Sequence, residues 1–102
     1  MSLYRGTTPT LEFKFKFNLE DLDITAFYIT FVQHGETKLE MDLKEVEIKE
    51  NVAKVELTQE ETLSLEPNDN LYIQARIKLG EKAYATNIIK TSLNTILKEG
   101  VI

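Results

Sequence analysis

Few side chains in this chain could support catalysis or metal binding. His34 is the one histidine among 102 residues, and cysteine is absent. A general base or a zinc site would have to be built around this imidazole, which stands beside Gly35 where a hairpin turn is predicted. This context indicates an ordinary turn residue. The lack of cysteine excludes disulfides, thiolate metal ligands and thiol nucleophiles.

The acidic residues, glycines and serines form no catalytic or binding motif. Residues 20–23 could offer carboxylate oxygens to calcium, but the ligand alternation and the central glycine of a calcium loop are missing. None of the four glycines is placed as a phosphate loop requires, and Ser2, Ser64 and Ser92 lack the glycine-flanked elbow of a nucleophile. We therefore predict a protein that is not an enzyme, with no catalytic residue, no cofactor and no bound metal.

The charge balance narrows the classes of partner. Seventeen acidic residues against twelve basic ones give a net charge of -5, the wrong sign for holding phosphate backbones. No stretch approaches the length of a membrane span, and no basic segment followed by an apolar run opens the chain. We expect neither a nucleic-acid partner nor a membrane.

The elements that would position any site are predicted to be strands, because hydrophobicity repeats with period two. Residues 11–17 and 71–79 alternate apolar and polar side chains, as a strand with one buried face does. Residues 26–33 are apolar on both faces, which is typical of a central strand covered twice. Residues 82–93 are read as one further strand.

Turn residues lie between these predicted strands. Hairpin turns are predicted at His34-Gly35, Glu50-Asn51 and Gly80-Glu81, with Asn51 in the left-handed conformation. The capping-box sequence from Thr58 to Glu61 predicts a short helical turn.

Together these elements predict an all-β fold in a single domain over residues 1–102. The strand count and turn spacing favour an immunoglobulin-like antiparallel β-sandwich of about seven strands with one short helical turn. A small barrel has the same strand pattern and stays an alternative. Residues 1–9 are interpreted as a leader and residues 94–102 as a C-terminal tail.

The tyrosines offer a second functional reading. Phenylalanines fit the core by alternation, which leaves Tyr4, Tyr28, Tyr72 and Tyr84 as a candidate platform for stacking on sugars. Tyrosines at strand positions are more often half-buried sandwich residues. A carbohydrate-binding module for attachment to a host cell surface is the alternative function.

Four segments carry a resemblance to a known group of proteins. Residues 5–10, 57–62, 87–90 and 96–102 resemble small proteins encoded among the tail and baseplate genes of prophages of Gram-positive bacteria. The strand pattern is also similar to the immunoglobulin-like N-terminal modules of baseplate proteins. The resemblance implies a structural or assembly component with other tail or baseplate proteins as partners, or with copies of itself. It implies a location in the virion, or in the cytoplasm of the bacterial host during assembly.

Both ends of the chain are candidate contact surfaces. Residues 5–10 are rich in hydroxyls and backbone groups, and they either lie along a neighbouring subunit or form a frayed leader. The last seven residues include large apolar side chains, which either fold back on the sandwich or are buried in a partner. The candidate protein contacts are Arg5, Gly6, Thr7, Thr8, Pro9, Ile96, Leu97, Val101 and Ile102.

Overall fold

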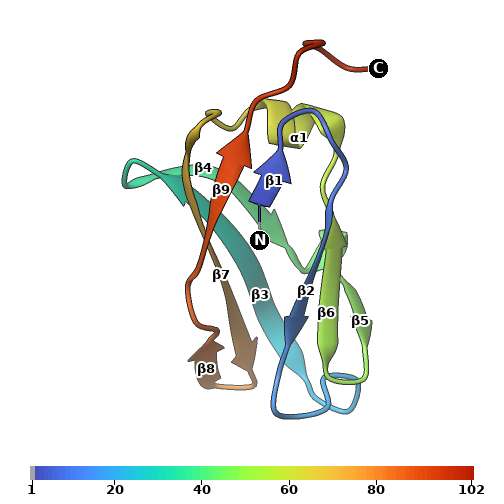
Figure 1. Cartoon of the computed structure of the whole chain (residues 1–102). Coiled ribbons are helices and arrows are strands. Elements are labelled where there is room, and N and C mark those ends of the chain that lie inside the picture. The colour runs from blue at the N-terminus through green and yellow to red at the C-terminus, as the bar shows by residue number, and fades with distance from the viewer. Residues whose placement is uncertain (1) are drawn as a thin grey trace.

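The computed structural model describes residues 2–102, which form an all-β sandwich of a larger and a smaller sheet. The strands are β1 (Ser2–Tyr4), β2 (Thr10–Lys14), β3 (Ile24–Gln33), β4 (Glu36–Asp42), β5 (Glu47–Lys49), β6 (Val52–Glu56), β7 (Asp69–Leu79), β8 (Lys82–Ala85) and β9 (Ile89–Asn94). The larger sheet has the order β1-β9-β7-β3-β4, with β8 also paired to β7. The smaller sheet has the order β2-β6-β5 and lies across it (Figure 1).

The period-two pattern predicted the buried face of β7 correctly, and burial alternates along β3 as well. The inward positions of β3 and β7 are buried, including Phe27, Ile29, Ile73 and Ile77. They form one apolar cluster with residues of the smaller sheet such as Phe13. Removing this apolar surface from water, at about 25 cal/mol per Å², is the main force that holds the two sheets together.

The prediction that β3 is covered on both faces is wrong. β3 lies inside the larger sheet between β7 and β4, but the smaller sheet covers only one face. On the other face Tyr28 is 46% exposed, and Tyr72 of the neighbouring β7 is 37% exposed. We call this uncovered side the outer face of the larger sheet.

The tight turns follow the predicted positions with one difference. His34 and Gly35 both have positive φ, at 54° and 72°, so the β3–β4 connection is a two-residue hairpin turn as expected. In the β5–β6 turn, Glu50 rather than Asn51 takes the left-handed conformation. Asn51 instead binds the backbone of Phe15: its carbonyl accepts from the Phe15 amide, and its side-chain Nδ2 donates to the Phe15 carbonyl.

Two predicted strands differ from the extents expected for them. The strand predicted over residues 11–17 ends at Lys14, and Phe15 and Phe17 follow it as partly buried residues packed on the core. The strand predicted over residues 82–93 is divided into β8 and β9, which pair with successive parts of the same edge of β7. Thr86 causes this break, since its backbone and hydroxyl together bind the backbone of Ala75.

The segment interpreted as a leader contains a strand. β1 pairs in parallel with β9, with Leu3 opposite Leu93, and Leu3 is only 6% exposed. The sheet is therefore not wholly antiparallel, and this part of residues 1–9 belongs to the core; Met1 lies outside the described residues. At the other end of the chain, Asn94 is the last residue of β9 rather than the first of a tail.

The predicted helical turn is confirmed as α1 (Gln59–Leu63). Thr58 accepts a hydrogen bond from the Glu61 amide at 3.1 Å, and the Glu61 carboxylate accepts one from the Thr58 amide at 2.8 Å. A second capped turn, η1 (Leu43–Glu45), follows β4. In residues 2–102 no helix has the length and apolar character needed to cross a membrane.

Candidate functional site

The two ends of the chain meet at Arg5, beside α1. The Arg5 guanidinium donates to the carbonyls of Leu65 at 3.1 Å and Leu63 at 3.0 Å, which are backbone acceptors left free where the helix ends. It also donates to both carboxylate oxygens of Glu99 at 3.1 Å. A cation is favourable at a helix C-terminus, so Arg5 joins the leader, α1 and the C-terminal segment.

The rest of the predicted leader is also ordered against its own chain. The Thr7 carbonyl accepts from the Thr62 hydroxyl at 2.9 Å, and the Pro9 carbonyl accepts from the Leu57 amide at 2.9 Å. Gly6 has φ +70°, and a Cβ there would come within 2.8 Å of Ile96 Cδ1. Residues 5–9 are therefore neither frayed nor free, and of the predicted contacts in this segment only Thr7 and Thr8 are exposed.

The C-terminal segment, residues 95–102, divides the four predicted apolar contacts into two groups. Ile96 is partly buried beside Gly6. The other three point into solvent, with exposures of 103% for Leu97, 55% for Val101 and 87% for Ile102. We call Leu97, Val101 and Ile102 the C-terminal strip.

The C-terminal segment contacts the sandwich at two residues although its apolar side chains are exposed. Gln59 of α1 binds the backbone of Ile102 in both directions, accepting from its amide at 2.8 Å and donating to its carbonyl at 3.1 Å. Glu99 is held by Arg5. The segment runs beyond α1 at the end of the sandwich (Figure 1). Its strip is exposed there.

The outer face of the larger sheet is a second accessible surface. Val32 stands opposite Tyr72 and Tyr28 opposite Arg76 in the register of β3 and β7. Beside Tyr72 lies a shallow groove of about 280 Å³, which is lined mainly by apolar groups of Thr30, Val32, Tyr72, Ile73, Gln74 and Ile88. A groove of about 210 Å³ lies beside Tyr28. All four tyrosines of the predicted platform are exposed, but only Tyr28 and Tyr72 share this face of β3 and β7.

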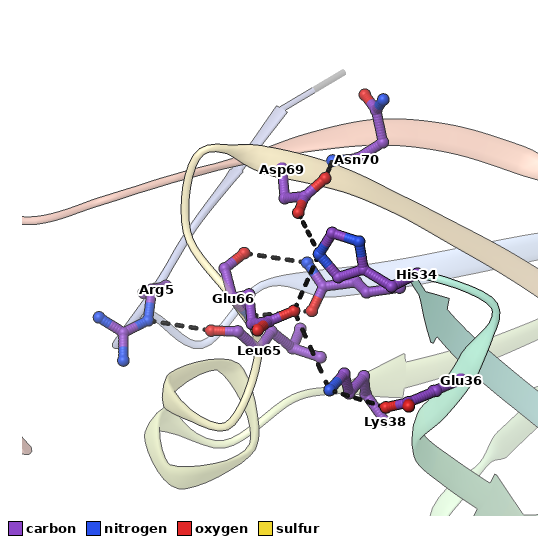
Figure 2. A network of polar contacts seen from close by, with 9 residues as sticks. Arg5, His34, Glu36, Lys38, Leu65, Glu66, Asp69 and Asn70 are labelled. Carbon is purple, nitrogen blue, oxygen red and sulfur yellow. Dashed lines mark hydrogen bonds and ion pairs between the residues drawn. The ribbon is translucent and has the colours of Figure 1, made fainter.

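A polar network that the sequence patterns did not indicate lies next to the β3–β4 turn. Gln33 is fully buried, and its amide binds the backbone of Glu66 in both directions, at 2.9 and 2.8 Å. The carboxylate of Glu66 points to His34 and Lys38 (Figure 2). Gln33 lies at an inward position of β3. A polar residue at an inward position needs a hydrogen-bond partner, and this was the sequence feature that could have indicated the network.

Comparison of the chain with protein-family models, with curated proteins and with solved structures gives no match. The all-β sandwich is shown by the structure itself. Its immunoglobulin-like classification and the resemblance to prophage tail proteins stay predictions.

Proposed function

We propose that the protein is a non-enzymatic structural or assembly module of a phage or prophage tail or baseplate, acting through protein–protein contacts. The resemblance carried by residues 5–10, 57–62, 87–90 and 96–102 supports the phage assignment. Its partners are other tail or baseplate proteins, with self-association as a second mode. It acts in the virion, or in the cytoplasm of the bacterial host during assembly.

The C-terminal strip is the observation that carries the contact function. Three large apolar side chains are exposed on a segment whose Ile102 backbone is bound by Gln59 and whose Glu99 carboxylate is bound by Arg5. Contacts made beforehand lower the entropy lost on binding. Burial of each such side chain in a partner gains about 1.5–3 kcal/mol, which suits an assembly contact.

Particles from an induced prophage that carries this gene test the proposal. We expect mass spectrometry to find the protein in purified tails or in tail precursors. Leu97→Asp should lower its incorporation at least about tenfold, because a charge cannot enter an apolar interface unpaired. Lys98→Ala, at the adjacent exposed position, is the matched control and should leave incorporation unchanged.

Two results would contradict this function. One is normal tail assembly after deletion of the gene together with absence of the protein from every particle fraction. The other is a gene neighbourhood of metabolic rather than tail genes. Sedimentation of the purified protein separates the two contact modes: a dimer that Leu97→Asp dissociates supports self-association, and a monomer supports a different tail protein as the partner.

Carbohydrate binding is the second candidate, and the outer face of the larger sheet favours it. Tyr28 and Tyr72 are exposed there, and Tyr72 borders an open groove whose lining is mainly apolar. Exposed aromatic faces are suited to stacking on the apolar side of a sugar ring.

Titration with cell-wall polysaccharides tests this candidate. Binding that Tyr72→Ala abolishes would support it. Tyr84→Ala is the control, since Tyr84 is similarly exposed but packs against Phe17, away from the groove. Heat signals at background for every polysaccharide would remove carbohydrate binding from consideration.

A further inference from the structure

Three metal-ligating side chains converge beside the β3–β4 turn. The ring nitrogen Nε2 of His34 lies 3.1 Å from Glu66 Oε2 and 2.5 Å from Asp69 Oδ2. One ligand atom from each of the three residues lies within 4.8 Å of the other two. Figure 2 shows the imidazole facing both carboxylates, one on the segment that follows α1 and the other at the start of β7.

We propose that His34, Glu66 and Asp69 form a binding site for a divalent transition-metal ion, with Zn²⁺ as the best fit. Imidazole nitrogen and carboxylate oxygen are both zinc ligands, and two carboxylates balance the charge of the ion. Ligand bonds of about 2.0–2.2 Å place tetrahedral ligand atoms roughly 3.3 Å apart, so Asp69 has to withdraw by only about 1 Å. Ca²⁺ and Mg²⁺ prefer sites made wholly of oxygen.

The buried amide of Gln33 sets the position of two ligands at once. Gln33 directly precedes His34 in the chain, and it binds both the amide and the carbonyl of Glu66. The hairpin turn that carries His34 is therefore fixed to the segment that carries Glu66. Ligands held in place before binding lose little conformational entropy when the ion arrives.

Asp69 is oriented by its own hydrogen bonds. Its Oδ1 accepts from the Asn70 amide at 2.8 Å, which leaves Oδ2 directed toward His34. The amide of the preceding residue, Asn68, binds the Leu93 carbonyl at 2.6 Å and fixes the start of β7. The side chains of His34 and Glu66 are 58% and 50% exposed, so an ion reaches the cluster from solvent.

Lys38 competes with an ion for this cluster. Its ammonium nitrogen lies 4.0 Å from Glu66 Oε2 and 3.4 Å from Glu36 Oε2. A positive charge at that distance lowers cation affinity by Coulomb repulsion. Lys38→Met removes the charge and keeps an unbranched apolar stem, so it should tighten zinc binding by about threefold or more.

The test is calorimetric titration of the full-length, tag-free protein with Zn²⁺, Mg²⁺ and Ca²⁺. We expect one Zn²⁺ per chain, with Mg²⁺ and Ca²⁺ at least about tenfold weaker. His34→Asn and Asp69→Asn should each weaken Zn²⁺ binding at least tenfold, as loss of a direct ligand does. Asparagine suits the left-handed conformation at position 34, so the turn is retained.

A control variant and an NMR measurement complete the test. Glu81→Gln makes the same charge change in an exposed turn outside the cluster and should leave Zn²⁺ affinity unchanged. Because the chain has one histidine, Co²⁺ added in place of Zn²⁺ should broaden the His34 ring protons in an unambiguous NMR spectrum. The proposal is overturned if Zn²⁺ fails to bind at millimolar concentration, or if His34→Asn binds as tightly as the native chain. An affinity that Lys38→Met leaves unchanged or weakens would also overturn it.

Discussion

Arg5 connects three parts of the chain through one guanidinium group, which is only 18% exposed. Arg5→Ala leaves the carbonyls of Leu63 and Leu65 without these hydrogen bonds, and we expect the free energy of unfolding to fall by about 2 kcal/mol. Urea denaturation measures the loss. Glu99→Gln weakens only the exposed ion pair and should cost below about 1 kcal/mol. Equal losses in the two variants would show that the ion pair, not the carbonyl contacts, holds the junction.

Two glutamines allow a second comparison at the scale of single residues. Gln33 and Gln59 each bind one backbone residue in both directions, but Gln33 is fully buried and Gln59 is partly exposed. Gln33→Ala removes two partly buried hydrogen bonds to the backbone of Glu66, so we expect a loss of about 2–3 kcal/mol. Gln59→Ala should cost below about 1 kcal/mol, because water replaces the glutamine. Thermal unfolding of both variants measures these losses of stability. A larger loss for Gln59→Ala than for Gln33→Ala would contradict the prediction.

Sequence patterns describe residues that are close together along the chain. They therefore predict local contacts but not contacts between distant segments. The capping box at Thr58 is local and was predicted correctly. The cluster of His34, Glu66 and Asp69 depends on pairing between β3 and β7, so no local spacing indicates it. The reading of His34 as an ordinary turn residue described its backbone correctly and missed its partners.

At the scale of elements, β1 has only three residues but contributes a buried side chain to the core. Leu3 is 6% exposed and stands opposite Leu93. Leu3→Ala should lower the free energy of unfolding by about 2–3 kcal/mol, since it opens a cavity between β9 and the core. Tyr4→Ala, on the adjacent exposed position, should cost below about 1 kcal/mol. Chemical denaturation distinguishes them, and equal losses would mean that Leu3 is not part of the core in solution.

Long alternating strands were predictable because burial of one face produces an alternation of apolar and polar residues in the sequence. β7 shows this. β7 and the continuously apolar β3 were both placed within two residues of their ends. β1 was missed because three residues are too short to display a period. The break between β8 and β9 was missed because it depends on the Thr86 hydroxyl binding a distant backbone amide.

At the scale of the whole molecule, the sandwich is elongated, with extents of 44, 27 and 20 Å. β3 and β7 have a paired strand on each side, whereas β8 pairs only with β7 and is exposed throughout. We expect amide hydrogen exchange to be slowest at the centres of β3 and β7 and at least about 100-fold faster in β8. Mass spectrometry of exchanged peptides measures this difference. Equal protection in β8 and β7 would show that a further contact covers β8 in solution.

Because β1 pairs with β9, β1 has no partner strand until the ribosome has made β9. Leu93 is made 90 residues after its partner Leu3. At about 5–20 residues per second, a ribosome leaves β1 without its partner for roughly 5–20 s. During that interval the Leu3 side chain is accessible to chaperones, and β7 has no neighbour along the part of its edge that β9 later covers. β1 can therefore dock only after β9 has been made, and a change that delays this docking would leave the edge of β9 open to another molecule.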